Sequence, residues 1–205
     1  WSYDSTTDTA ALVADINPSG DSYPADLTVY NGKLYFQADD GAAGSELWSY
    51  DSTTDTAELV ADINSGSLGS FPQYLAVYND KLYFTADNGV DGDELWSYDS
   101  TTDTAALVAD INPSGDSYPA DLTVYNGKLY FQADDGAAGS ELWSYDSTTD
   151  TAELVADINS GSLGSFPQYL AVYNDKLYFT ADNGVDGDEL WSYDSTTDTA
   201  ALVAD

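Results

Sequence analysis

Residues 26–63 read "DLTVYNGKLYFQADDGAAGSELWSYDSTTDTAELVADI", and this stretch contains four short strand patterns separated by turn residues. In the first pattern, residues 26–31, Leu27 and Val29 share one side of the expected strand. Asn31 and Gly32 follow, and Asn-Gly is a strong hairpin signal because a type I′ turn needs positive φ at both positions. The stretch therefore predicts consecutive antiparallel strands joined by tight turns.

The other three patterns cover residues 33–39, 46–51 and 57–63, and we call the four strands A, B, C and D in chain order. Their apolar side chains point to both faces, with Leu34 and Phe36 opposite Tyr35, so both faces of the sheet must be covered. No segment has a helical period long enough to supply that cover. We therefore expect sheets packed on similar sheets, as in an all-β β-propeller of four-stranded antiparallel blades. A stacked β-solenoid is the alternative, but three tight hairpins and one long crossover per unit are less typical of it.

The unit repeats along the whole chain, which we interpret as a single repeat domain, 1–205. Residues 1–110 are identical to residues 96–205, and this identity indicates either a very recent duplication or, as we favour, an engineered or consensus-like chain. The segment WSYDSTTDTA begins at Trp1, Trp48, Trp96, Trp143 and Trp191. The expected blades are 26–63, 74–111, 121–158 and 169–205, preceded by a partial blade, 1–16, which corresponds to strands C and D.

The partial blade makes one C–D hairpin redundant. Either residues 1–16 or residues 191–205 could pair with strands A and B at 169–182, and the unused hairpin would be free to pair with a neighbouring chain. A closed four-bladed monomer, a multi-chain ring and a swapped assembly all satisfy the sequence. The two-blade period favours an even number of blades, four or eight.

Four segments carry a resemblance to a known family: SELWSYDST at 45–53, DELWSYDST at 93–101, LVADIN at 59–64 and LYFTADNG at 82–89. They resemble the ELW…DGT repeat of bacterial extracellular proteins, and the resemblance implies a propeller fold and an extracellular, cell-surface setting, with no defined activity. The Asp-Gly-Thr turn of that family reads Asp51, Ser52, Thr53 here. A change of turn geometry is expected from the missing glycine.

The charge balance excludes several classes of function. With 37 acidic residues against four lysines the net charge is −33, which disfavours nucleic acid and anionic membrane surfaces as partners. No apolar stretch approaches eighteen residues, so we expect no membrane insertion. Without His or Cys the usual catalytic triads and zinc sites are unavailable, and we expect no enzyme. The lysines are expected to neutralise aspartates in the C–D turns; they are Lys33, Lys81, Lys128 and Lys176.

The loops between strands B and C are the candidate metal sites, because calcium takes six to eight oxygen ligands. The ligand spacing differs from that of an EF-hand loop. The alternative, which we favour, is that these Asp side chains hydrogen-bond the backbone of their own turns. The candidate calcium ligands are Asp39, Asp40, Asp87, Asp91, Asp93, Asp134, Asp135, Asp182, Asp186 and Asp188.

Aromatic side chains beside the acidic connections are candidates for a glycan pocket. Trp48 and Tyr50 lie on one side of strand C and are expected to pack against the next blade, so they are poor candidates. Crevices between blades hold the sugars of lectin propellers of the tachylectin type, and equivalent weak sites could act by multivalency. The candidate pocket residues are Tyr23, Phe71, Tyr74, Tyr118, Phe166 and Tyr169.

The sequence thus favours a non-catalytic, symmetric, acidic propeller that serves as a scaffold or assembly module, with self-association through the duplicated C–D hairpin. The alternative is an extracellular binding module with repeated weak calcium or glycan sites.

Overall fold

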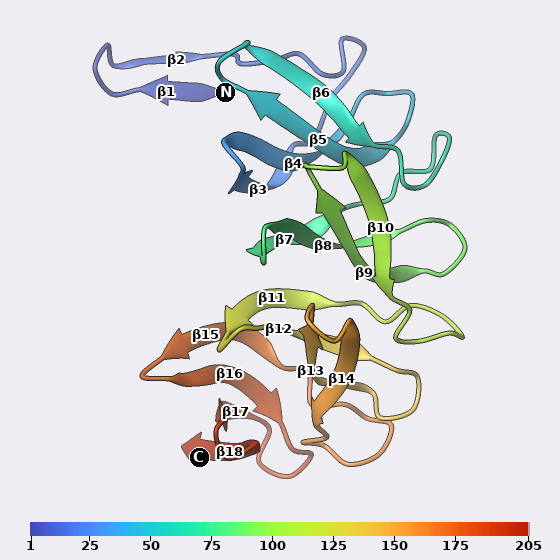
Figure 1. The fold of residues 1–205 in the computed structure, drawn as a ribbon, viewed down its shortest axis with the longest axis vertical. Helices are drawn as coiled ribbons and strands as arrows, with labels where there is room; N and C mark the ends of the chain where they lie inside the picture. The colour runs from blue at the N-terminus through green and yellow to red at the C-terminus, as the bar shows by residue number, and fades with distance from the viewer. Residues whose placement is uncertain (205) are drawn as a thin grey trace.

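The computed structural model describes residues 1–204, which form eighteen β-strands and no helix (Figure 1). Sixteen strands make four antiparallel four-stranded sheets, each in sequential order, which we call blades I to IV. Blade I is β3 (Ala25–Tyr30), β4 (Lys33–Asp39), β5 (Ser45–Asp51) and β6 (Thr56–Ala61). Blade II is β7 (Gln73–Tyr78), β8 (Lys81–Asp87), β9 (Asp93–Asp99) and β10 (Thr104–Ala109).

Blade III is β11 (Ala120–Tyr125), β12 (Lys128–Asp134), β13 (Ser140–Asp146) and β14 (Thr151–Ala156). Blade IV is β15 (Gln168–Tyr173), β16 (Lys176–Asp182), β17 (Asp188–Asp194) and β18 (Thr199–Ala204). The first two strands, β1 (Ser2–Asp4) and β2 (Thr9–Ala11), form a separate hairpin. The predicted all-β class is confirmed, and the strands predicted within 26–63 agree with β3 to β6 to within two residues. No helix that could span a membrane occurs in residues 1–204.

The turns follow the local chemistry of the sequence. Asn31 and Gly32 have φ values of 46° and 80°, as the predicted hairpin between β3 and β4 requires. In the turn between β5 and β6 the left-handed residue is Asp55, at 57°, and Ser52 is not in that region. The expected change of turn geometry therefore has no cause at Ser52, because this position does not require the positive φ that a glycine would allow.

The core lies between the blades, as expected for sheets that are apolar on both faces. Between blades II and III, Tyr83 and Leu95 pack against Phe131 and Trp143. The same kind of cluster joins blades I and II and blades III and IV. Trp143 packs against blade II, so the strand C aromatics do lie between blades as predicted. The blade they contact is the preceding one, whereas the sequence predicted the next one.

Polar contacts tie each first strand to the next blade. Tyr78, the last residue of β7, donates its hydroxyl hydrogen to the carbonyl of Gly127 in blade III at 2.7 Å. Tyr30 and Tyr125 make the equivalent bonds from blades I and III. Three of the predicted lysine pairs form at 3.6–4.0 Å, and pairs this exposed typically stabilise by under about 1 kcal/mol; they are Lys81–Asp99, Lys128–Asp146 and Lys176–Asp194.

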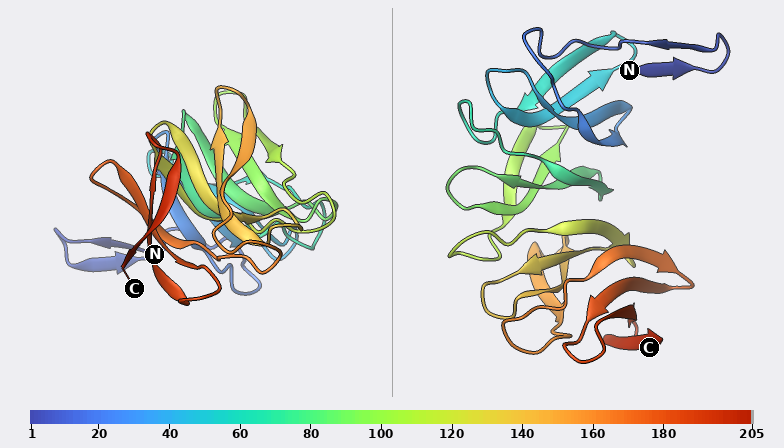
Figure 2. Two further views of the ribbon diagram at one scale, coloured as in Figure 1. Left: turned by 90° about the horizontal axis from the view of Figure 1, so that it is seen from below. Right: turned by 180° about the vertical axis from the view of Figure 1, so that it is seen from behind.

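The four blades form an open arc. The first strands of consecutive blades pack against each other, β3 against β7, β7 against β11 and β11 against β15. Within the described residues, β15 and β3 do not pack against each other in this way. Blades I and IV lie at opposite ends of the arc, and the hairpin β1–β2 projects from the end at blade I (Figure 1). Figure 2 shows the same separation of the two ends from behind. Each end therefore presents one blade face that has no neighbouring blade.

Candidate interaction surfaces

The B–C loops and the connections between blades meet on one face of the arc, as the topology predicts. A buried glutamate at the start of strand C organises each junction. At the junction of blades II and III, the Glu94 carboxylate accepts from the backbone N–H groups of Ile111, at 2.9 Å, and Ser117, at 3.0 Å, and from the Ser117 hydroxyl. Glu46 and Glu141 accept the matching isoleucine N–H and serine hydroxyl at the other two junctions, with the N–H of Asn64 or Asn159 as the third donor.

The side chain of Glu94 is fully buried. Burial, which disfavours the charged form, raises its pKa from 4.5 to about 7 despite the bonds from Ser117 and Ile111. The pKa values of Glu46 and Glu141 are also raised, with burial as the main cause. These glutamates therefore hold consecutive blades together and are not available to ligands.

The candidate calcium ligands lie in the B–C loops, where they accept hydrogen bonds from their own turns. Asp40 Oδ1 accepts from the N–H groups of Ala42 and Ala43, both at 2.8 Å. In the sister loop, Asp91 Oδ2 accepts from Asn88 Nδ2 at 2.8 Å. The carboxylates at the start of the loops each accept an N–H two residues later at 2.6–2.7 Å; they are Asp39, Asp87, Asp134 and Asp182. Asp135 and Asp186 repeat the bonds of Asp40 and Asp91.

Among residues 1–204 no group of three or more acidic, His or Cys side chains is placed to hold a metal ion. Four carboxylates line part of a groove of about 440 Å³ between the loop of blade II and the following connection; they are Asp87, Asp91, Asp110 and Asp116. Next to it, burial and then the neighbouring carboxylates of Asp116 and Asp87 raise the pKa of Asp93. Asp188, its counterpart in blade IV, is exposed. The calcium site therefore stays a prediction, with its proposed ligands engaged in turns.

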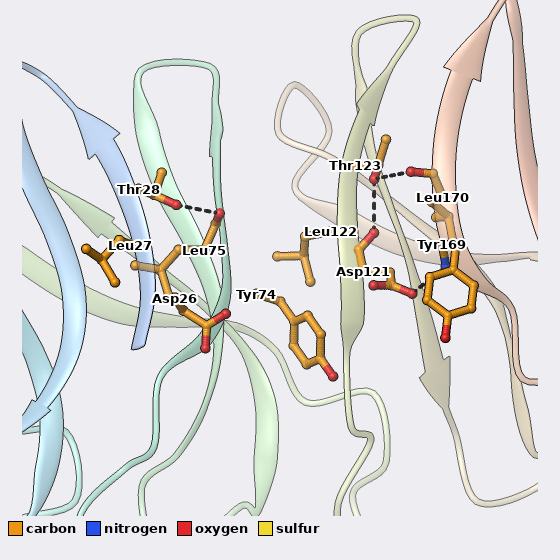
Figure 3. Close-up of a pocket in the computed structure, with 10 residues that line it drawn as sticks. All are labelled: Asp26, Leu27, Thr28, Tyr74, Leu75, Asp121, Leu122, Thr123, Tyr169 and Leu170. Atoms are coloured by element: carbon orange, nitrogen blue, oxygen red, sulfur yellow. Dashed lines mark hydrogen bonds between the residues drawn. The ribbon is translucent and has the colours of Figure 1, made fainter. Parts of the chain in front are cut away.

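A second hollow, of about 300 Å³, lies on the concave side of the arc (Figure 3). It is lined by the first strands of all four blades, with Asp26 and Asp121 alternating with Tyr74 and Tyr169. Each of these four residues sits where the register of its strand pair shifts, and each has φ between 53° and 58°. Neighbouring strands are linked here, for example by the Tyr169 N–H, which donates to Asp121 Oδ2 at 2.7 Å.

The predicted glycan residues divide between two places. Tyr74 and Tyr169 line the concave hollow. The other four, Tyr23, Phe71, Tyr118 and Phe166, are exposed in the connections between blades and do not line it. The six residues therefore do not form one pocket, and the sequence pattern could not reveal this because all six follow the same acidic connections.

The end face of blade IV is a surface that sequence reasoning missed. Blades II and IV are identical in sequence over 74–109 and 169–204, yet Tyr78 is 3% exposed and its counterpart Tyr173 is 65% exposed. Leu95 is fully buried, whereas Leu190 is 41% exposed. Glu189, the counterpart of the buried Glu94, is partly exposed. The difference arises because blade III covers blade II and no blade covers blade IV.

The opposite end, on blade I, carries an apolar groove of about 200 Å³ beside the N-terminal segment. Phe36 and Trp48 form a small cluster there with Ile16, Leu34 and Tyr50. The groove is lined by Trp1, Val13, Ile16, Leu27, Leu34, Phe36 and Tyr50, together with smaller residues. In the identical blade III this face carries Phe131 and Trp143 and packs against blade II.

The comparisons with known proteins bear on the fold. No protein-family profile and no curated protein matches the sequence. Among solved structures, the chain is similar to TolB from Acinetobacter baumannii, with 15% identity and a TM-score of 0.58 over 89% of this chain and 44% of TolB. It is also similar to a puromycin-hydrolyzing peptidase of Mycobacterium tuberculosis, with 13% identity and a TM-score of 0.64 over 92% of this chain and 30% of the peptidase.

A puromycin hydrolase S511A mutant complexed with PGG gives a similar result, with 16% identity and a TM-score of 0.61 over 87% of this chain and 28% of the hydrolase. The fold is a β-propeller. The chain spans less than half the length of each of these proteins. At such low sequence identity the similarity shows a shared fold and nothing about activity.

Proposed function

We propose that this chain is a non-catalytic, acidic β-propeller scaffold that acts by associating with further copies through its two end faces. The observation that carries the proposal is the exposure of Tyr173, Leu190 and Glu189, whose sequence counterparts in blade II are covered by blade III. Since blade I is identical to blade III over 26–61 and 121–156, the missing cover for blade IV is a second blade I.

The contacts expected at such an interface follow from the junction of blades II and III. There, Tyr78 donates to the Gly127 carbonyl, and the Asn79 side-chain amide donates to the Ser147 hydroxyl at 2.6 Å. Shifted by 95 residues, these bonds become Tyr173 to Gly32 and Asn174 to Ser52 of another copy. An end-to-end contact of this kind is heterologous, so it can continue from copy to copy until the ring closes.

The net charge of −33 opposes association at low ionic strength, because like charges on two copies repel. Salt screens this repulsion, and the apolar contact between the end faces does not depend on it. Association is therefore expected to increase with salt. The resemblance to the ELW…DGT repeat supports an extracellular site of action, and the identity of the two halves supports a consensus-like origin.

The test is the mass of the chain in solution, measured by light scattering after size exclusion at 0.15 M and 1 M salt. The wild type is expected to show a multi-chain mass that grows with salt. Tyr173→Asp is expected to return the mass to that of one chain, because it places a carboxylate in the interface. A wild type that stays a single chain at every concentration and salt would overturn the proposal.

Leu163→Asp is the matched control, since it makes the same kind of change at a residue that is 73% exposed. Its counterpart Leu68 is equally exposed although blades flank it on both sides, so this position lies outside the blade interface. Leu163→Asp is expected to keep the multi-chain mass.

A further inference from the structure

The hairpin β1–β2 is folded as the outer half of a blade but has no inner half. The Tyr3 hydroxyl donates to Asp8 Oδ1 at 2.6 Å, as the Tyr193 hydroxyl does to Asp198 at 2.8 Å. All of its strand residues are exposed, and Trp1 is 84% exposed. Within residues 1–204, the strands β1 and β2 pair only with each other.

The connection that follows the hairpin is already seated as it is between two blades. Asn17 Nδ2 donates to the Asp21 carbonyl at 3.2 Å, and Asn112 Nδ2 donates to the Asp116 carbonyl at 3.0 Å. The N–H of Asp39 donates to the Ser22 carbonyl at 2.9 Å, which matches the bond from Asp134 to Ser117 at the junction of blades II and III. The hairpin is therefore tethered where the outer strands of a blade preceding blade I would lie.

We propose that β1–β2 of one copy pairs with β16 in blade IV of a second copy, and takes the place of residues 191–204 there. This inference rests on the proposed function, and it names the segment through which the copies are joined. The acceptor is a second copy because blade IV of the same chain lies at the far end of the arc (Figure 1).

The register of the exchanged pairing follows from the sequence. In blade IV, Phe179, Tyr178 and Leu177 pair with Trp191, Ser192 and Tyr193. Residues 1–14 are identical to residues 191–204, so Trp1, Ser2 and Tyr3 would meet the same three partners. In the exchange, β1–β2 becomes paired and residues 191–204 of the second copy are released, so the number of unpaired hairpins does not change. The strand contacts within blade IV also stay the same, because the two segments are identical.

The exchanged state is more stable because it covers the end face of blade IV. Glu189 would receive the N–H of Ile16 and the N–H and hydroxyl of Ser22, as Glu94 receives those of Ile111 and Ser117. Tyr173 and Leu190 would be covered at the same time. Apolar burial and the satisfaction of a half-buried carboxylate both favour the exchanged state.

Simple stacking without exchange meets a steric conflict. At the junction of blades II and III, the chain reaches the connection through residues 107–109, the end of β10. Residues 12–14 would have to take that path beside blade IV, but the identical residues 202–204 of β18 already occupy it. One of the two identical segments must leave, and only residues 12–14 continue into the docked connection.

The chain has no cysteine, so engineered disulfides report the pairing directly. In the full chain, Ser2→Cys combined with Tyr178→Cys places the two thiols across an antiparallel pair, where Cα atoms are about 4.5–5.5 Å apart. Mild oxidation is expected to convert most of the monomer band on a non-reducing gel to covalent multimers. A disulfide within one chain would overturn the proposal, because it would mean closure by the chain's own hairpin.

Mixtures of single variants give the control. Ser2→Cys mixed with Tyr178→Cys is expected to form a heterodimer in at least tenfold excess over Ser2→Cys mixed with Leu163→Cys. Should Tyr178→Cys fail to fold by circular dichroism, Asp4→Cys with Lys176→Cys replaces the pair, because Lys176 Nζ lies 3.6 Å from Asp194, the counterpart of Asp4.

A third pair separates the failure of this inference from the failure of the proposed function. Ser52→Cys with Asn174→Cys reports the contact of the end faces alone, since Asn79 and Ser147 are their counterparts. Multimers with the 52–174 pair but none with the 2–178 pair would overturn the hairpin exchange and leave the scaffold proposal intact. No multimers with either pair, and a single-chain mass, would overturn both.

Discussion

Glu94 joins two blades through one side chain, and this arrangement links stability to pH. Its folded-state pKa of about 7 lies above the usual value of 4.5, so the folded state binds the proton more tightly. The resulting stability is fully present below about pH 4.5 and is lost as the pH rises through about 7. Glu46 and Glu141 act in the same direction at the other junctions.

We therefore expect the chain to melt at a higher temperature at pH 5 than at pH 8. The difference should be about 1–2 kcal/mol in unfolding free energy, or roughly 2–8 °C. Glu94→Gln should narrow this difference, because it removes the group with the largest shift among the three. Scanning calorimetry at both pH values measures it, with the exposed Glu58→Gln as control. If Glu94→Gln and Glu58→Gln reduced the difference between pH 5 and pH 8 equally, Glu94 would not be the source of the pH dependence.

Gly139 and Gly164 bring the B–C loop of blade III against the following connection. A Cβ on Gly139 would lie 2.5 Å from Gly164 N and 2.8 Å from its Cα, and the φ of Gly139 is 77°. Gly127 has a similar φ of 80°, but a Cβ there meets no atom within 4 Å. The two glycines thus separate the effect of a close backbone approach from that of the dihedral angle alone.

Gly139→Ala is expected to lower the unfolding free energy by more than about 3 kcal/mol, because backbone atoms on both sides must shift. Gly127→Ala should cost about 1 kcal/mol, from the left-handed φ alone. Urea unfolding of both variants tests the difference. Similar losses for the two would mean that the loop and the connection are farther apart than described.

At the scale of elements, the acidic loops are turns whose carboxylates bond their own backbone. Calcium at 5 mM and excess chelator are therefore expected to give melting temperatures within about 1 °C of each other, since a ligand that does not bind the folded state cannot stabilise it. Thermal unfolding monitored by circular dichroism makes the comparison. A calcium-dependent rise that Asp91→Asn removes would instead establish the groove beside Asp91 as a metal site.

Much of the element structure could be predicted from the sequence, because its signals are local. Alternation placed Leu34 and Tyr35 on opposite faces, and Asn31-Gly32 located a turn. The concave hollow could not be predicted in the same way. Asp26 and Asp121 reach it because the register shifts at these positions, and a register shift depends on the partner strand as well as on the local sequence.

At the scale of the whole molecule, sequence alone could not give the exposure of the two ends. Tyr78 and Tyr173 lie in identical segments, so no local pattern distinguishes the buried residue from the exposed one. Their difference in exposure depends on whether another blade lies against them, and blade III covers Tyr78 whereas no blade covers Tyr173 in the described residues. The role of the glutamates was hidden for a related reason, since their partners lie 17 to 24 residues away in the next connection.

The identity of residues 1–110 with 96–205 also has a consequence for chains of other lengths. Adding or removing one 95-residue unit would leave the same residues on both sides of every blade junction. A variant of this chain that is shorter or longer by that unit would still have β1–β2 at one end of its arc and a blade identical to blade IV at the other. Chains of different lengths could therefore associate with one another through the same two end faces, whatever the number of blades in each.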